Sequence, residues 1–194
     1  MLTVPTSFCR PLGMTFVVLC LTCVLGCVPI ASNKPAAKYV NRDLKLTGDF
    51  FMQIGSTKER TPCSIKISDD EELPYTLTSP EVDDETFQVY TIGNLDLAFV
   101  ANYHEEDEER EKILGYTVVR IQVTKTQIVA ETLQKKFLED NPAALPGTVV
   151  KKDAFATDLT IRSTPEQLAL FFKLHQNTTG MFDAENRIIF RRIK

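Results

Sequence analysis

The stretch TFQVYTIGNLDLAFVANY (residues 86–103) decides the fold that the sequence predicts. Residues 86–92 alternate between two faces, which is typical of a half-buried strand. Gly93-Asn94 is a hairpin-turn signal, and residues 95–103 return as the partner strand. Strands joined by so short a turn must be antiparallel. The stretch therefore predicts an antiparallel β fold.

Other parts of the chain repeat this pattern. Further short strands are expected at residues 44–54, 63–68, 75–79, 115–123, 126–131, 158–162 and 187–193. Residues 79–85 (SPEVDDE) are interpreted as an acidic loop. In CSIKIS, Cys63, Ile65 and Ile67 alternate with polar residues, so all three are expected to face inward. Cys63 is interpreted as a buried structural cysteine, because a nucleophile needs exposure and a nearby base.

Two helices are expected among the strands. Residues 132–141 place apolar side chains on one face and end before Pro142. The second helix has clearer boundary signals. Thr164 is the expected N-cap, Pro165 takes the first helical position, and Gln167 completes a capping box.

About nine short strands and two short helices indicate a mainly β (α+β) domain. A meander of antiparallel strands must protect its edges, and closure into a barrel achieves this. The sequence predicts a small, partly open, lipocalin-like antiparallel β-barrel with the helices packed across an end or edge. A β-sandwich is the alternative. The 12 phenylalanines favour a filled interior.

The N-terminal segment has the three parts of a secretory signal. Arg10 supplies the positive charge, an apolar run follows, and Gly26 precedes Cys27. This arrangement resembles the lipobox of bacterial lipoproteins. The resemblance implies cleavage between Gly26 and Cys27 by signal peptidase II, with acyl chains such as palmitate attached at Cys27. An uncleaved N-terminal anchor is the alternative.

The domain organisation follows from this interpretation. Residues 1–26 are the expected signal peptide, 27–43 a lipidated tether without regular structure, and 44–194 one β-rich domain. Cys9, Cys20 and Cys23 would leave with the signal, so Cys63 would be the one cysteine of the folded domain. Cys20, Cys23 and Cys27 are interpreted as parts of an apolar signal rather than as a metal motif.

The C-terminal part resembles a group of uncharacterised bacterial lipoproteins. The resemblance is carried by GYTVVRI, NPAAL, LTIRSTPEQLALFFKLH and FRR, over residues 115–194. It implies a β-rich, lipocalin-like domain and an envelope location, and it transfers no active site.

Candidate chemical sites are few. HEEDEEREK (residues 104–112) lacks the glycine and the spacing of a calcium loop, so it is interpreted as a solvated hairpin loop. His104, His175 and Cys63 would have to converge to form a catalytic set, which we do not expect. RIIFRR (residues 187–192) is interpreted as an edge strand with basic residues that prevent aggregation, or as a contact with anionic headgroups.

The functional expectation is a non-enzymatic, lipid-anchored protein of the bacterial envelope, without metal or cofactor, which interacts with an envelope partner. A carrier of an apolar small molecule in the barrel is the alternative, and a hydrolase is a remote one. A net charge of -4 argues against a nucleic-acid partner. Val28, rather than Asp, follows the anchor, which favours the outer membrane, facing the periplasm.

Overall fold

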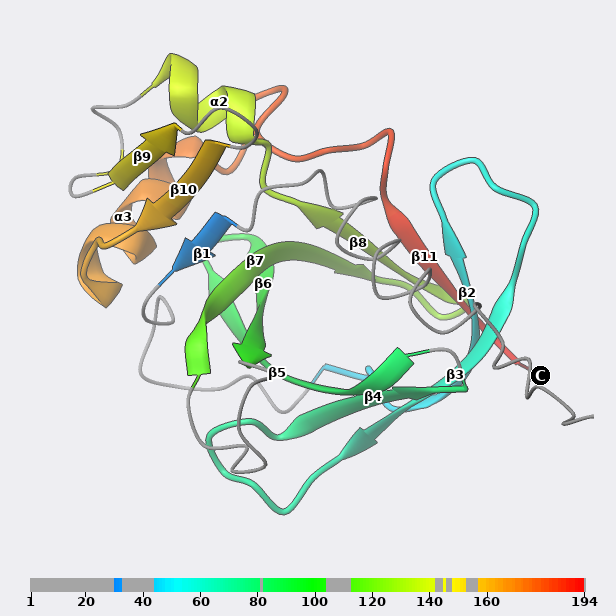
Figure 1. Cartoon of the computed structure of the whole chain (residues 1–194). Coiled ribbons are helices and arrows are strands. Elements are labelled where there is room, and N and C mark those ends of the chain that lie inside the picture. Colours follow the sequence, from blue (N-terminus) through cyan, green and yellow to red (C-terminus); the bar gives the residue numbers. More distant parts are fainter. Residues whose placement is uncertain are drawn as a thin grey trace, which may run out of the picture.

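The computed structural model describes residues 30–32, 44–80, 82–103, 113–141, 145, 148–152 and 157–193. Two short helices accompany a large sheet (Figure 1). The elements are β1 (Ile30–Ser32), β2 (Gly48–Ile54), β3 (Thr61–Ile67), β4 (Tyr75–Ser79), β5 (Val82–Ile92), β6 (Leu95–Tyr103), β7 (Ile113–Val123), β8 (Gln127–Thr132), α2 (Lys135–Asp140), β9 (Thr148–Lys152), β10 (Thr157–Ile161), α3 (Pro165–His175) and β11 (Ile188–Arg192).

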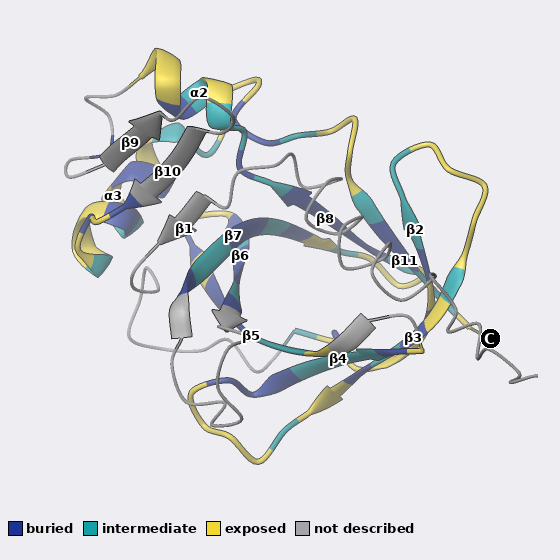
Figure 2. Ribbon diagram, viewed as in Figure 1, coloured by how far each residue is buried: buried dark blue, intermediate teal, exposed yellow. Residues whose placement is uncertain are grey.

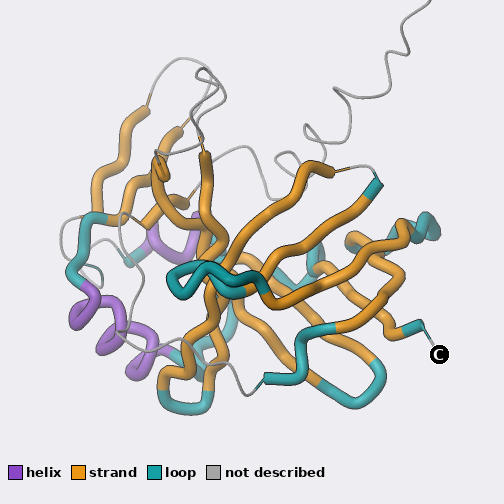
Figure 3. Tube along the Cα trace, turned by 90° about the horizontal axis from the view of Figure 1, so that it is seen from below, coloured by secondary structure: helices purple, strands orange, loops and turns teal. Residues whose placement is uncertain are grey.

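Eight of the strands form a closed antiparallel barrel. Around the ring they follow the order β6-β5-β4-β3-β2-β11-β8-β7, and pairing of β7 with β6 closes it. The prediction of a mainly β, lipocalin-like antiparallel barrel with two short helices is confirmed, but the ring of strands is closed rather than partly open, because β6 pairs with β7. The helices lie together on one side of the barrel (Figure 3).

Three strands extend the sheet beyond the barrel. β7 is long enough that Val119–Val123 pair with β8, while Tyr116 and Thr117 pair with β1. β1 in turn pairs in parallel with β10, which pairs with β9. The expectation that residues 27–43 lack regular structure is therefore wrong at Ile30–Ser32. All three residues pair with β10, and Ala31 and Ser32 also pair with β7. Such tertiary pairing outweighs local sequence signals.

Two apolar cores flank the barrel sheet, one inside the barrel and one on the outer face of β5, β6 and β7. Buried residues are concentrated along these strands, whereas β3 has many exposed ones (Figure 2). On β5, Phe87 and Val89 face the barrel interior, whereas Tyr90 and Ile92 face outward. This outer face is covered by α3, so Tyr90 keeps only 4% of its surface exposed. The inner core contains Leu46, Phe50, Met52, Cys63, Ile65, Tyr75, Phe87, Val89, Ala98, Val119, Ile121, Ile128, Ala130 and Phe190.

Helix α3 begins as the sequence predicts. The Thr164 hydroxyl accepts a hydrogen bond from the Gln167 backbone N–H at 3.3 Å, and the Gln167 side chain accepts one from the Thr164 N–H at 2.8 Å. Leu168, Phe171 and Phe172 are buried against the outer face of the barrel. The reciprocal cap fixes where the helix starts and therefore which face it presents to the barrel.

Several sequence expectations need correction. Ile67 is 61% exposed rather than inward-facing, because β2 begins opposite Ile65 and gives Ile67 no neighbour on that side. Residues 82–85 belong to β5 rather than to a loop, because they pair with β4. β11 is not an edge strand, since it lies between β2 and β8 in the closed ring. Its basic residues therefore protect no edge.

Candidate functional site

Arg192 connects two segments at one end of the barrel. Phe190 belongs to the inner core, and Arg192 lies two residues further along β11, on the same face. The guanidinium carbon lies 4.9 Å from the ring centroid of Phe50, a cation–π distance. Two guanidinium N–H groups donate to backbone oxygens, one to Thr47 at 2.9 Å and one to Lys45. Arg192 therefore ties the last barrel strand to the segment that precedes the first.

Gly48 makes this arrangement possible. Its φ of +138° lies in a region that residues with side chains rarely adopt. A Cβ at this position would lie 3.0 Å from Nη1 of Arg192. Glycine is therefore favoured here both by the backbone conformation and by the close approach of the guanidinium.

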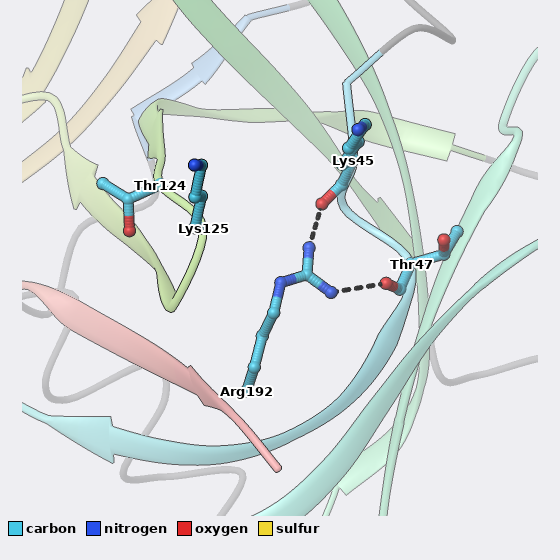
Figure 4. Close-up of a pocket in the computed structure, with 5 residues that line it drawn as sticks. All are labelled: Lys45, Thr47, Thr124, Lys125 and Arg192. Carbon is cyan, nitrogen blue, oxygen red and sulfur yellow. Dashed lines mark hydrogen bonds between the residues drawn. The ribbon is translucent and has the colours of Figure 1, made fainter. Parts of the chain in front are cut away.

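A depression of about 370 Å³ lies at this end of the barrel. Its lining comes from three segments far apart in the sequence: the residues before β2, the β7–β8 hairpin and the end of β11 (Figure 4). The lining residues are Lys45, Thr47, Thr124, Lys125 and Arg192. We call this feature the cationic depression.

The hairpin side of the cationic depression is held by hydrogen bonds. The Thr124 hydroxyl donates to the Gln127 carbonyl at 2.9 Å and accepts from the Gln127 N–H at 3.1 Å. The Thr124 N–H also donates to the Gln127 carbonyl at 2.8 Å. These bonds fix the backbone on which Lys125 stands, while its long side chain stays exposed.

The charged groups of the cationic depression form no ion pair within the described part of the chain. Lys45, Lys125 and Arg192 each carry a positive charge, and none of them forms an ion pair with a described carboxylate. Nε of Arg192 likewise makes no hydrogen bond to a described residue. The arrangement can bind an anion, because ammonium and guanidinium groups form strong hydrogen bonds to oxyanions.

Little in the sequence indicates this site. RIIFRR predicts that Arg192 protects an edge strand. Nothing in the local pattern marks Lys45 or Lys125, since one precedes a strand and the other occupies a hairpin turn. The one usable signal was Gly48, a glycine at the start of a strand pattern, which indicates a close backbone approach.

The other residues considered from the sequence do not form a site together. Gly26, Cys27 and the run 104–112 with His104 lie outside the described residues. Cys63 is buried in the inner core, where burial raises the pKa of its thiol to about 11. His175 lies at the end of α3, with its ring centroid 4.8 Å from that of Phe171. The two groups belong to opposite faces of the barrel sheet and cannot act as a catalytic pair.

Arg120 and Glu131 form an ion pair elsewhere on the barrel. Arg120 donates two hydrogen bonds to one carboxylate oxygen of Glu131, the one from Nε at 2.7 Å. Its guanidinium carbon also lies 4.6 Å from the ring centroid of Phe182. The pair joins β7 to β8 on the outer face, and its groups satisfy one another, so it is interpreted as structural.

Within the ranges that the structure describes, no three His, Cys, Asp or Glu residues are grouped so that they could hold a metal ion. In the same ranges, no helix has both the length and the apolar character needed to cross a membrane. Comparison with family models, with curated proteins and with solved structures finds no match to this chain.

Proposed function

We propose that the protein is a non-enzymatic, lipid-anchored component of the bacterial envelope, in which the barrel is a scaffold for interaction with an envelope partner. Lipid attached at Cys27, after cleavage at Gly26, would hold the domain at the outer membrane, facing the periplasm. Two or more acyl chains give stable anchoring, whereas one chain gives only reversible binding.

The packed interior of the barrel is the observation that carries the scaffold proposal. Phe50, Tyr75, Phe87 and Phe190 all point into the barrel, and none is more than 7% exposed. Phe50 and Phe190 meet edge to face at 6.2 Å between centroids, and Tyr75 stacks on Phe87 at 5.3 Å. A carrier needs an apolar cavity of roughly 300–1,000 Å³. Four packed rings in the interior reduce the space available for such a cavity.

The described chemistry also favours a role without catalysis. Cys63 is the one cysteine of the described chain, and its raised pKa keeps the thiol protonated near neutral pH. A nucleophile of this kind needs a nearby base and a lowered pKa. His175, the histidine that the structure describes, packs against aromatic rings on the outer side of the barrel sheet.

Native mass spectrometry tests the scaffold against the alternative of an apolar-ligand carrier. The full chain would be purified from cells in a mild detergent that is removed in the gas phase. We expect the mass of the polypeptide with its covalent lipid and nothing more. A carrier barrel loaded with a fatty acid, measured in the same way, controls for ligand loss. A reproducible additional apolar molecule bound to the native chain would contradict the scaffold proposal.

A further inference from the structure

We propose that the cationic depression is a binding site for a phosphate group. The proposal goes beyond the scaffold function and does not depend on the lipid anchor. It rests on the geometry of Arg192, on two lysines that line the same depression, and on the absence of an ion pair between these groups and any described carboxylate.

Arg192 is the preorganised part of the site. Its bonds to the carbonyl oxygens of Lys45 and Thr47 and its contact with the Phe50 ring hold the guanidinium in one place. A guanidinium has five N–H donors, of which these bonds use two. Nε, which is unpaired among the described residues, is on the side of the guanidinium that faces Thr124 and Lys125 (Figure 4). A fixed donor loses little entropy when an oxyanion binds.

Lys45 and Lys125 supply two ammonium groups on long, exposed side chains. Both side chains are exposed, come from different segments and line the same depression. Three like charges gathered without a counter-charge repel one another, and a bound anion would remove that repulsion. The chain as a whole is acidic, with a net charge of -4, so this local excess of positive charge runs against the overall composition.

A phosphate group fits this donor set. It carries more negative charge than a single carboxylate and presents several strong acceptor oxygens. Those oxygens can be shared between one guanidinium edge and the ammonium groups of exposed lysine side chains, which stand on different segments of the lining.

The position of the depression relative to the proposed lipid anchor indicates whether the phosphate belongs to the bilayer. This argument rests on the proposed anchor at Cys27. β1 pairs with Tyr116 and Thr117, whereas the cationic depression lies beyond Val123 at the other end of β7. Seven strand residues span roughly 23 Å. β1 begins three residues after Cys27, a stretch of at most about 11 Å. The depression would therefore face away from the anchoring bilayer, toward a phosphate that is not part of that bilayer.

The test is an NMR titration of the full chain in a neutral detergent. Sodium phosphate is compared with sodium chloride at equal ionic strength. We expect saturable amide shifts at residues 45–47, 124–125 and 192 with phosphate alone. Lys125→Met should weaken binding about tenfold, because a charge-assisted hydrogen bond is lost. The double variant Lys45→Met/Lys125→Met should abolish it.

Lys58→Met is the matched control. Lys58 is exposed in the β2–β3 loop, away from the depression, and its replacement should leave phosphate binding unchanged. Because the three lysines are exposed and unpaired among the described residues, the variants should keep the native spectrum elsewhere. Absence of phosphate-specific shifts, or equal weakening in the Lys58 control, would overturn the proposal.

A second titration identifies the source of the phosphate. The detergent is supplemented with phosphatidylglycerol in place of inorganic phosphate. We expect no saturable shifts at the depression with this lipid, which would assign the site to a phosphate outside the bilayer. Shifts that Lys125→Met removes would still support phosphate binding, but they would assign the site to a lipid headgroup.

Discussion

The contacts of Arg192 could not be predicted from the sequence. Its position at the end of the apolar run RIIFRR predicts a basic residue on an edge strand. The structure instead puts β11 inside a closed ring, so the side chain packs over Phe50 and binds the carbonyl oxygens of Lys45 and Thr47. The partners precede Arg192 by 142 to 147 residues, and no local pattern indicates such a contact.

The buried environment of Cys63 agrees with the prediction from the sequence. The alternation in CSIKIS indicated an inward cysteine, and the side chain is 7% exposed in the inner core. The same alternation failed at Ile67, because a pattern of period two does not show where the neighbouring strand begins.

The buried thiol makes stability depend on pH at high pH. Burial raises the pKa of Cys63 from 9.0 to about 11, so the unfolded chain loses this proton more readily than the folded one. Its contribution to stability is fully present below pH 9 and is lost as the pH rises toward 11. We expect the free energy of unfolding to fall by about 2 kcal/mol more in the native chain than in Cys63→Ala over this range.

Urea denaturation of both proteins at about pH 8 and about pH 11 measures this difference. The pKa of Tyr90 is also raised by burial, to about 12, and its contribution has the same sign. Tyr90 is present in both proteins, so its contribution cancels in the comparison. Equal pH dependence in the two proteins would show that the Cys63 thiol does not titrate as described.

At the scale of elements, strands with a strong local pattern were predicted and strands defined by their partners were not. The hairpin of β5 and β6 follows directly from alternation and from Gly93-Asn94. β1 and β9 were missed, because each depends on pairing within the ladder β7-β1-β10-β9. The acidic composition of residues 82–85 predicts a loop, although these first residues of β5 pair with β4.

Helix α3 offers the clearest test of a predicted element boundary. Thr164→Ala removes the hydroxyl that accepts the Gln167 N–H, so it should lower the free energy of unfolding by about 1 kcal/mol. Amide hydrogen exchange should also speed up in the first turn of α3. Thr179→Ala is the control, since Thr179 is exposed after the helix and makes no hydrogen bond to a described residue. Equal effects of the two substitutions would mean that the cap does not stabilise the helix.

At the scale of the whole molecule, the fold could be predicted but the site could not. A run of short, locally paired strands leaves exposed edges, and closure into a barrel is one way to remove them, with a β-sandwich as the alternative that the sequence leaves open. The cationic depression instead depends on which segments meet at one end of the barrel, namely the residues before β2, the β7–β8 hairpin and the end of β11. That meeting is set by the order of strands around the ring, in which β11 lies between β2 and β8.

The lipid anchor completes the proposed account of the whole molecule. If Cys27 carries lipid, β1 and the strands paired with it stay close to the membrane, while the cationic depression is held on the far side of the barrel. Both the location and the scaffold role therefore depend on the chemistry of one cysteine.

Incorporation of labelled palmitate into the full chain, produced in bacteria, tests this dependence directly. We expect the native chain and Cys23→Ala to be labelled. Cys27→Ala should remain unlabelled and uncleaved, because in bacterial lipoproteins, whose lipobox the sequence resembles, acylation of the thiol precedes cleavage. Labelling that persists in Cys27→Ala would contradict the anchor and, with it, the proposed role at the membrane.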